Sequence, residues 1–207
     1  MTRPEAVVFD IGNVLIEWQP ERFYDRVIGE PARRAMFAHV DLHAMNDRID
    51  LGEGFATVVE GCARTYPDWA DAIRLWHTNW LDMAAPAIPQ SVRLMRALRA
   101  RGVPVFALTN FGVETFALAR QDYDFLNEFD RLYVSGHLRT AKPGSAIFAH
   151  VEADSGIAPG RLIFADDRAE NIAAAKARGW QVHQFITPGA WGRALIDAGL
   201  LQEEDVA

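Results

Sequence analysis

The 207-residue sequence has little cysteine, no long apolar run and no excess of positive charge. Cys62 is the single cysteine, which excludes an intramolecular disulfide framework. No stretch approaches the ~20 apolar residues that a membrane span requires. The first apolar run covers only residues 6–9, which is too short for the core of a signal peptide. These absences lead us to expect a soluble cytoplasmic protein without a membrane partner.

Charge and composition further limit the kind of protein and the partners that this sequence indicates. The formal net charge is −7, and an acidic surface repels phosphate backbones, so a nucleic-acid partner is not expected. Half of the residues are apolar and 24% are charged, as in ordinary globular proteins. Only two of the 21 basic residues are lysines, Lys142 and Lys176. Because arginine is the usual positive charge in this chain, each lysine is a candidate functional residue.

Five short apolar runs are rich in β-branched or aromatic residues, and two of them, at residues 7–9 and 162–164, show no polar alternation. Both faces of such strands are buried, which is typical of a parallel sheet covered by helices. The runs cover residues 6–9, 103–108, 131–135, 162–165 and 181–186.

Helical segments are predicted between these runs. Residues 91–101 and 169–178 have helical character, with Ser91 as a predicted N-cap. Strands that alternate with helices in this way imply right-handed crossovers. The predicted fold is therefore an α/β fold with an open, Rossmann-like, doubly wound parallel sheet.

A long segment interrupts this alternation, and a loop of that length without structure is implausible. Its dense aromatic residues are expected to fill a small helical core. We expect residues 17–88 to form an all-helical cap over the active end of the sheet, and residues 1–16 and 89–207 to form the core domain. Helices are predicted in the cap over residues 20–28, 31–39, 54–65 and 68–81.

Polar side chains follow three of the predicted strands. Asp10 follows the first, Thr109 the second, and Asp166 and Asp167 the fourth. Ligands bind beyond the carboxyl ends of strands in open parallel sheets. Two carboxylates 4 Å apart repel by about 4 kcal/mol at an effective dielectric of 20, so either a carboxyl pKa rises steeply or cations lie among the carboxylates. Oxygen ligands of this kind suit Mg²⁺, and Lys142 is the available protein cation.

Together these residues resemble the motifs of the haloacid-dehalogenase-like (HAD) hydrolase superfamily. The opening of the chain is most similar to the branch that contains α-D-glucose-1-phosphate phosphatase and the amino-terminal domain of soluble epoxide hydrolase. The resemblance implies the strand order 5-4-1-2-3. The four matching motifs, in chain order, are Asp10-Ile11-Gly12-Asn13-Val14-Leu15, Leu108-Thr109-Asn110, Lys142-Pro143, and Asp166-Asp167 with Asn171.

The resemblance also implies a nucleophile and a metal site. Asp10 would attack phosphorus and form an aspartyl-phosphate. Mg²⁺ would be held by the Asp10 side chain, the Gly12 carbonyl and Asp167, with Asp166 bound directly or through water.

The same resemblance implies a phosphate site. Thr109 and the backbone N–H of Asn110 would bind the phosphoryl oxygens, and Lys142 would neutralise charge between nucleophile and phosphate. The implied activity is a Mg²⁺-dependent phosphatase for small phosphate esters, sugar phosphates included, because a cap encloses a small volume.

One position departs from the pattern of the family. Phosphatases of this superfamily usually carry a second aspartate two residues after the nucleophile, as general acid and base, and here that residue is Gly12. General acid–base catalysis is typically worth 10²–10⁴-fold. Glu17, Glu53 and His77 of the predicted cap are candidates to replace it, although a structural role suits each of them too.

Two other functions stay open at this stage. A 2-haloacid dehalogenase would also use Asp10 as nucleophile and needs no second aspartate, but its carboxylate substrate would meet three acidic side chains without a compensating metal. A catalytically weak binding protein with this fold would explain Gly12, but not the retained acids and Lys142. The oligomeric state does not follow from the sequence.

Overall fold

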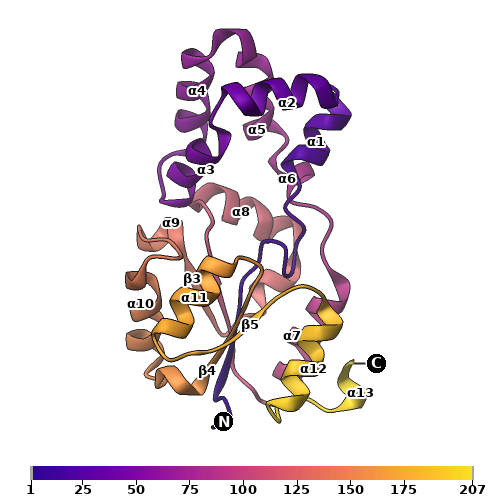
Figure 1. The fold of residues 1–207 in the computed structure, drawn as a ribbon, viewed down its shortest axis with the longest axis vertical. Helices are drawn as coiled ribbons and strands as arrows, with labels where there is room; N and C mark the ends of the chain where they lie inside the picture. The colour runs from indigo at the N-terminus through magenta and orange to yellow at the C-terminus, as the bar shows by residue number, and fades with distance from the viewer. Residues whose placement is uncertain (1, 207) are drawn as a thin grey trace.

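A five-stranded parallel sheet occupies one half of the molecule, and the computed structural model describes residues 2–206 (Figure 1). The strand order is β3-β2-β1-β4-β5, which confirms the predicted arrangement. Each of the five apolar runs overlaps one strand, and β2 and β4 extend one residue beyond their runs, to Thr109 and Asp166. The strands are β1 (Ala6–Phe9), β2 (Val105–Thr109), β3 (Arg131–Val134), β4 (Leu162–Asp166) and β5 (Gln181–Gln184).

The register of the sheet brings the polar strand ends to one level. Phe9 pairs with Ala107 on one side and with Ala165 on the other. Asp10 and Asp166 therefore reach the edge of the sheet at the same level, and Thr109 follows one residue further along β2. Because β1 is central, Asp10 lies between the ends of β2 and β4.

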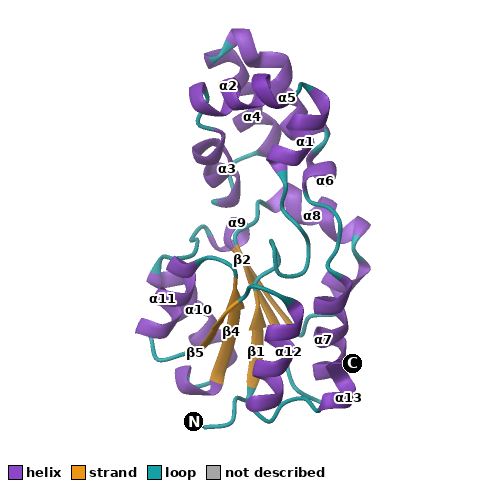
Figure 2. Ribbon diagram, turned by 45° about the vertical axis from the view of Figure 1, so that its right-hand side comes forward, coloured by secondary structure: helices purple, strands orange, loops and turns teal. Residues whose placement is uncertain are grey.

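Helices cover both faces of the sheet (Figures 1 and 2). On one face lie α7 (Pro89–Ala100) and α12 (Pro188–Asp197), and on the other lie α10 (Ser145–Ser155) and α11 (Ala169–Ala177). The remaining helices of this half are α8 (Val113–Asp122), α9 (Ser135–Leu138) and α13 (Glu203–Val206), with 3-10 turns at Asp124–Asn127 and Pro159–Arg161.

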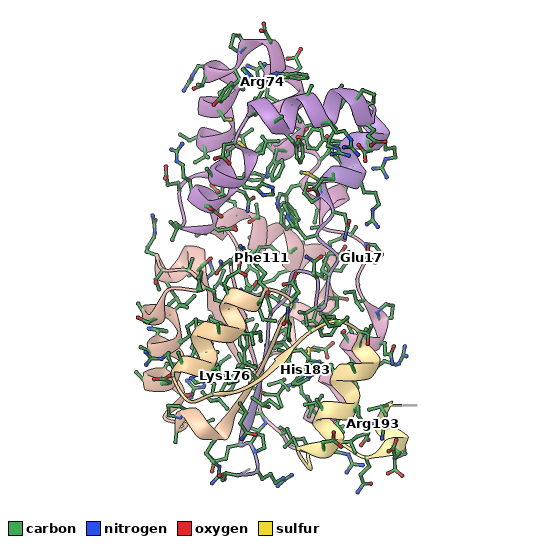
Figure 3. The ribbon with its side chains drawn as sticks, viewed as in Figure 1. Glu17, Arg74, Phe111, Lys176, His183 and Arg193 are labelled. Atoms are coloured by element: carbon green, nitrogen blue, oxygen red, sulfur yellow. The ribbon has the colours of Figure 1, made fainter. Side chains whose placement is uncertain are left out.

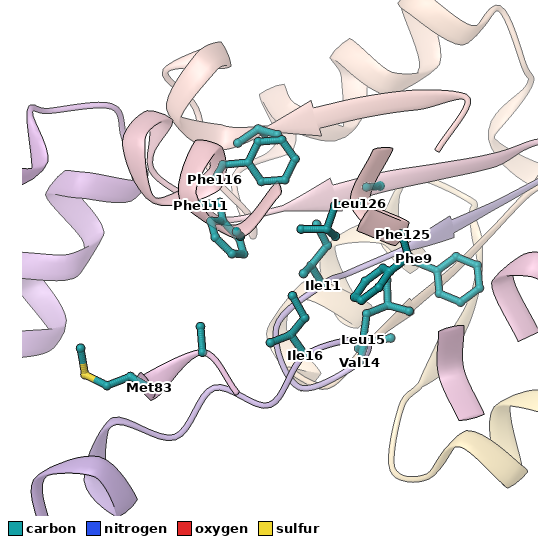
Figure 4. Packing of buried hydrophobic residues seen from close by; sticks show 14 of the residues in the cluster. Phe9, Ile11, Val14, Leu15, Ile16, Met83, Phe111, Phe116, Phe125 and Leu126 are labelled. Carbon is teal, nitrogen blue, oxygen red and sulfur yellow. The ribbon is translucent and has the colours of Figure 1, made fainter. Parts of the chain in front are cut away.

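Alternate side chains of β1 supply the two faces of the core. Phe9 points to the α12 side, where its ring lies 5.8 Å from that of Trp191. Figure 4 shows Phe9 packed with Phe125 and Leu15 in this cluster. Val8 points the opposite way and joins the cluster that contains Phe148. Both faces of β1 are therefore buried, as its unbroken apolar run predicts.

The helical half of the molecule lies beyond the carboxyl ends of the strands (Figure 1). Its rings form a small core, as expected, with those of Tyr24 and Trp76 stacked 6.2 Å apart. Its helices are α1 (Pro20–Val27), α2 (Glu30–His39), α3 (Leu42–Asp50), α4 (Phe55–Thr65), α5 (Ala70–Thr78) and α6 (Trp80–Met83), with a 3-10 turn at Pro67–Trp69.

The structure differs from the predicted helices at three places. The helix predicted over residues 68–81 is divided into a 3-10 turn, α5 and α6, with a break at Asn79. Helix α3 is not among the predicted segments, although Asp41 caps it by accepting a hydrogen bond from the Ala44 N–H. Ser91 is not an N-cap: α7 begins at Pro89, whose fixed φ suits the first helical turn, and Ser91 is buried inside the helix.

The chain enters and leaves the helical half through a short paired stem. Ile16 and Ala87 form an antiparallel bridge. On either side of it, the Glu17 N–H donates to the Pro86 carbonyl and the Ile88 N–H donates to the Leu15 carbonyl. No helix in the described part of the chain is both long and apolar enough to cross a membrane.

A second contact joins the two halves at the end of α3, which we call the α3 seam: Ile49–Gly52 against Phe111–Gly112 and Ser135–Gly136. The Ser135 hydroxyl donates to the Asp50 carbonyl at 2.6 Å. A Cβ at Gly112 would lie 2.6 Å from Ile49 Cγ2, closer than real contacts allow. Glycine at this position therefore permits the close approach of α3 to the sheet half.

Replacement of Gly112 by alanine tests this packing. The new methyl group would also lie 3.0 Å from the Ile49 carbonyl oxygen, so α3 would have to shift. We expect Gly112→Ala to lower the free energy of unfolding by about 1–3 kcal/mol, the usual cost of overpacking. Urea denaturation measures the change.

The matched control is Gly61→Ala in the interior of α4, where a Cβ would meet nothing within 4 Å. This substitution should raise the free energy of unfolding by about 0.5–1 kcal/mol, because alanine loses less conformational entropy in a helix. Equal effects of the two substitutions would contradict a steric requirement for glycine at the seam.

Candidate active site

Three acidic side chains meet at the carboxyl edge of the sheet. Asp10, Asp166 and Asp167 each offer a carboxylate oxygen within 4.8 Å of the others. Asp166 is fully buried, Asp10 nearly so, and Asp167 partly exposed. The chain thus brings together residues more than 150 positions apart, because β1 and β4 are neighbours in the sheet.

Lys142 is the counter-ion of this cluster. Its ammonium Nζ lies 2.8 Å from Asp10 Oδ1 and 2.7 Å from Asp166 Oδ2, and all three side chains are at least nine-tenths buried. Nζ also donates to the Leu108 carbonyl at 2.8 Å. The three donors of the ammonium are therefore satisfied by two carboxylates and a strand carbonyl, which offsets the penalty for burying it.

The backbone of Lys142 is held by the end of β2. Asn110 Nδ2 donates to the Lys142 carbonyl, and Asn110 Oδ1 accepts from the Lys142 N–H, both at 2.9 Å. This pair of bonds leaves the backbone N–H of Asn110, not its side chain, available to a ligand. The Thr109 side chain is buried at the same strand end and borders the cavity described below.

A tight loop follows Asp10. The Ile11 N–H donates to Asp10 Oδ1 at 2.7 Å, and Asn13 adopts a left-handed conformation with φ 54°, which asparagine tolerates better than most residues. Asn13 Nδ2 donates to Asp167 Oδ2 at 3.0 Å. A Cβ at Gly12 would meet nothing within 4 Å, so the loop leaves open space at this residue.

Burial dominates the electrostatics of the nucleophile candidate. Burial, and then the nearby charges of Asp166 and Asp167, raise the pKa of Asp10 to about 7 against the opposing effect of Lys142. Burial also raises the pKa of Asp167. Burial alone would lower the pKa of Lys142, but Asp10 and Asp166 outweigh it and raise that pKa above its ordinary value. Lys142 therefore stays positively charged, beside two carboxyl groups, Asp10 and Asp167, whose surroundings disfavour the charged form.

The carboxylate cluster opens into a cavity of about 300 Å³ between the two halves of the molecule. Figure 3 shows Glu17 and Phe111, two of its lining residues, in this region. The sheet half contributes the charged cluster and the ends of β1, β2 and β4. The helical half contributes a mixed wall that consists of Glu17, Trp18, His43, Asn46, Asp47, Asp50, Trp76, Trp80 and Ala84.

Of the three candidates for the missing general acid, one lies at the cavity and two lie away from it. Glu17 lines the cavity, but its carboxylate pairs with Arg22 at 2.8 Å. Glu53 and His77 are not lining residues: Glu53 pairs with Arg48, and the His77 ring packs 4.6 Å from that of Phe55. The polar residues that α3 brings to the cavity were missed, because the helix itself was not predicted. The buried repeat of Leu42, Met45 and Ile49 was the available signal.

The donor set suits a hard divalent cation. The three carboxylates, together with backbone carbonyls of the Asp10 loop, offer only oxygen, as Mg²⁺ prefers. Asp166 is already engaged, because its two oxygens accept from the Arg168 N–H, Asn171 Nδ2 and Lys142 Nζ. Asp10 and Asp167 keep more free acceptor capacity and are the better direct ligands.

The sequence matches a known family over most of its length. A model described as haloacid dehalogenase-like hydrolase matches residues 4–179. The sesquiterpene phosphatase astK of Aspergillus oryzae is 31% identical over 191 residues, which cover 84% of this chain and 86% of that protein.

The fold is also similar to solved structures. The HAD family enzyme bt-2542 of Bacteroides thetaiotaomicron has a TM-score of 0.74 at 21% identity, over 93% of this chain and 98% of that one. The same enzyme has been solved with magnesium and inorganic phosphate. An L-2-haloacid dehalogenase of Xanthobacter autotrophicus has a TM-score of 0.63 at 18% identity, over 96% of this chain and 85% of that one. At these identities the structures support the fold, and the family match carries the assignment: the chain belongs to the haloacid dehalogenase-like hydrolases.

Proposed function

We propose that this hydrolase is a Mg²⁺-dependent phosphatase that acts on small phosphorylated metabolites, sugar phosphates included, through an aspartyl-phosphate on Asp10. The observation that carries the proposal is the buried cluster in which Lys142 bridges Asp10 and Asp166 beside Asp167. The phosphatase among its relatives supports the reaction class. The magnesium and phosphate complex of a structural neighbour supports the ligand set.

In this proposal Asp10 is the nucleophile. Its carboxylate lies at the cavity, held by the Ile11 N–H and by Lys142. Mg²⁺ would be held by Asp10, Asp167 and the Gly12 carbonyl, with Asp166 acting through water or through Lys142. When bound, the cation would neutralise the phosphoryl oxygens and keep Asp10 charged.

The remaining charge on the phosphoryl group would be met by the chain itself. Lys142 would contribute a fixed positive charge, while the Thr109 hydroxyl and the Asn110 N–H would donate hydrogen bonds. Such prepared donors require no reorganisation during the reaction, and positioning and charge neutralisation account for most of the catalysis of phosphoryl transfer.

We further propose that residues 17–88 act as a cap on a core formed by residues 1–16 and 89–207. The cavity between them has about 300 Å³, at the small end of ligand sites, which favours a small alcohol group on the phosphate. Its wall offers both rings and polar side chains. A substrate screen should therefore include sugar phosphates and, because of the Aspergillus relative, a sesquiterpenyl phosphate.

The alternative is dehalogenation of a 2-haloacid on Asp10. The cluster argues against it, because the substrate carboxylate would enter beside three acidic side chains and a single ammonium already shared by two of them. Like charges at such distances repel by several kcal/mol in a partly buried site.

Asp10→Asn tests the nucleophile. The wild type should release phosphate from p-nitrophenyl phosphate with Mg²⁺ and not with EDTA, and the variant should lose more than about 10³-fold of this activity. Chloride release from 2-chloropropionate is measured in parallel. Chloride release that survives EDTA, or phosphate release that survives the substitution, would overturn the proposal.

The response to Mg²⁺ should depend on pH. Burial raises the pKa of Asp10 to about 7, so Asp10 holds a proton below neutral pH. Burial also raises the pKa of Asp167, so this carboxyl binds protons at a higher pH than an ordinary aspartate. Mg²⁺ needs the charged carboxylates, so its binding releases these protons and strengthens as pH rises. We expect the increase in Tm on adding Mg²⁺ to be small at about pH 5.5 and to grow toward about pH 8.

Asp10→Asn serves as the control for this titration, since asparagine has no proton to lose. The variant should show a smaller Mg²⁺ effect that changes less with pH. A wild-type Mg²⁺ effect that is independent of pH would contradict a cation site at Asp10.

A further inference from the structure

The open position at Gly12 leaves the proposed reaction without an obvious proton donor. No side chain extends from this residue, and a Cβ there would meet nothing within 4 Å. An alkyl phosphate leaves slowly unless its oxygen is protonated, and water attacks slowly unless it loses a proton. Another group at the cavity must then carry the proton, and this inference rests on the proposed phosphatase function.

Asp50 lies at the carboxyl end of α3 and lines the same cavity as Asp10. Its carboxylate accepts a hydrogen bond from Asn46 Nδ2 at 2.8 Å, and the backbone of Gly112 lies close enough to lower its pKa. Its own carbonyl accepts from the Ser135 hydroxyl. Asp50 belongs to the helical half, yet the α3 seam fixes it against the loop that follows Thr109 and Asn110.

The other acidic residues of the cavity are less suited to this task. Asp10 and Asp167 belong to the carboxylate cluster, and Asp50 does not. Glu17 is paired with Arg22. Asp47, one turn earlier on α3, is exposed to solvent. Of the acidic side chains that line the cavity in residues 2–206, Asp50 alone is shielded, outside the cluster and without a basic partner.

The surroundings of Asp50 also suit a group that must give and take a proton. Burial, and then the charges of Asp47 and Asp10, raise the pKa of Asp50 to about 7, against the opposing effects of the Gly112 backbone and the Asn46 side chain. Near neutral pH both protonation states are therefore populated, which is the condition for acting first as acid and then as base.

We propose that Asp50 takes the place of the missing aspartate at position 12 as the general acid and base. As Asp10 forms its bond to phosphorus, the bond from phosphorus to the alcohol oxygen breaks, and that oxygen takes the proton of the Asp50 carboxyl. Asp50 then accepts a proton from water while the water oxygen attacks the aspartyl-phosphate. The bond from phosphorus to Asp10 breaks, inorganic phosphate leaves, and Asp50 is protonated again.

Asp50→Asn, compared on two substrates, tests this role. With an alkyl phosphate such as β-glycerol phosphate, turnover should fall by about 10²–10⁴-fold, because the leaving alkoxide is not protonated. With p-nitrophenyl phosphate the leaving group departs without a proton, so only the hydrolytic step is slowed. Rapid mixing should then show a burst of about one p-nitrophenolate per site, followed by a slow steady state.

Three further variants separate proton transfer from structure. Asp71→Asn removes an exposed carboxylate of the helical half and should change neither substrate's turnover. Ser135→Ala removes the bond to the Asp50 carbonyl, so it should lower Tm without a burst. Gly12→Asp in the Asp50→Asn background adds a carboxyl in open space and should restore much of the alkyl phosphate activity.

Each outcome decides the role of Asp50. An equal loss on both substrates without a burst would assign Asp50 to structure alone, and an unchanged rate on the alkyl phosphate would also overturn the proposal. If the Asn variant does not fold by circular dichroism, Asp50→Ala carries the same comparison, since it also removes the carboxyl. A wild type without Mg²⁺-dependent phosphate release would instead refute the proposed function, and the role of Asp50 with it.

Discussion

The burial of one ammonium between two carboxylates is the interaction on which the rest of this site depends. Lys142 contacts Asp10, Asp166 and the Leu108 carbonyl with its three donors. Without a cation there, the parallel sheet would place like charges side by side in a poorly solvated edge. Asn110 and Asn171 complete the arrangement by holding the lysine backbone and Asp166. The fold and the site therefore share the same hydrogen bonds.

Features that follow from strand periodicity could be predicted from the sequence. Unbroken apolar runs end in Asp10, Thr109 and Asp166, and a parallel sheet brings such ends together whatever the details of its helices. The family resemblance supplied the strand order and Lys142, which local pattern alone does not distinguish from a surface lysine. The strand order was predictable because it depends on topology rather than on the packing of individual side chains.

The features that escaped prediction depend on contacts between distant segments. Helix α3 is short and polar, and its few apolar residues become informative only when the surface they meet is known. The placement of Asp50 requires the seam with Gly112 and Ser135, which lie more than sixty residues away. Serine is a common N-cap residue, but Ser91 lies inside its helix, because the helix begins two residues earlier at Pro89. Local propensity gives way to tertiary packing in each case.

The paired stem at Ile16 and Ala87 has a consequence for how this architecture can vary. The backbone that enters the helical half is hydrogen-bonded to the backbone that leaves it. The spacing between these two connections to the sheet half is therefore fixed. A change in the segment beyond this stem would still have to preserve the other contacts between the halves. These include the α3 seam, the hydrogen bond from the Phe55 N–H to Glu114, and the packing of Trp80 on Phe111. The wall that the helical half gives to the cavity can thus vary while the cluster at the sheet edge keeps its own hydrogen bonds.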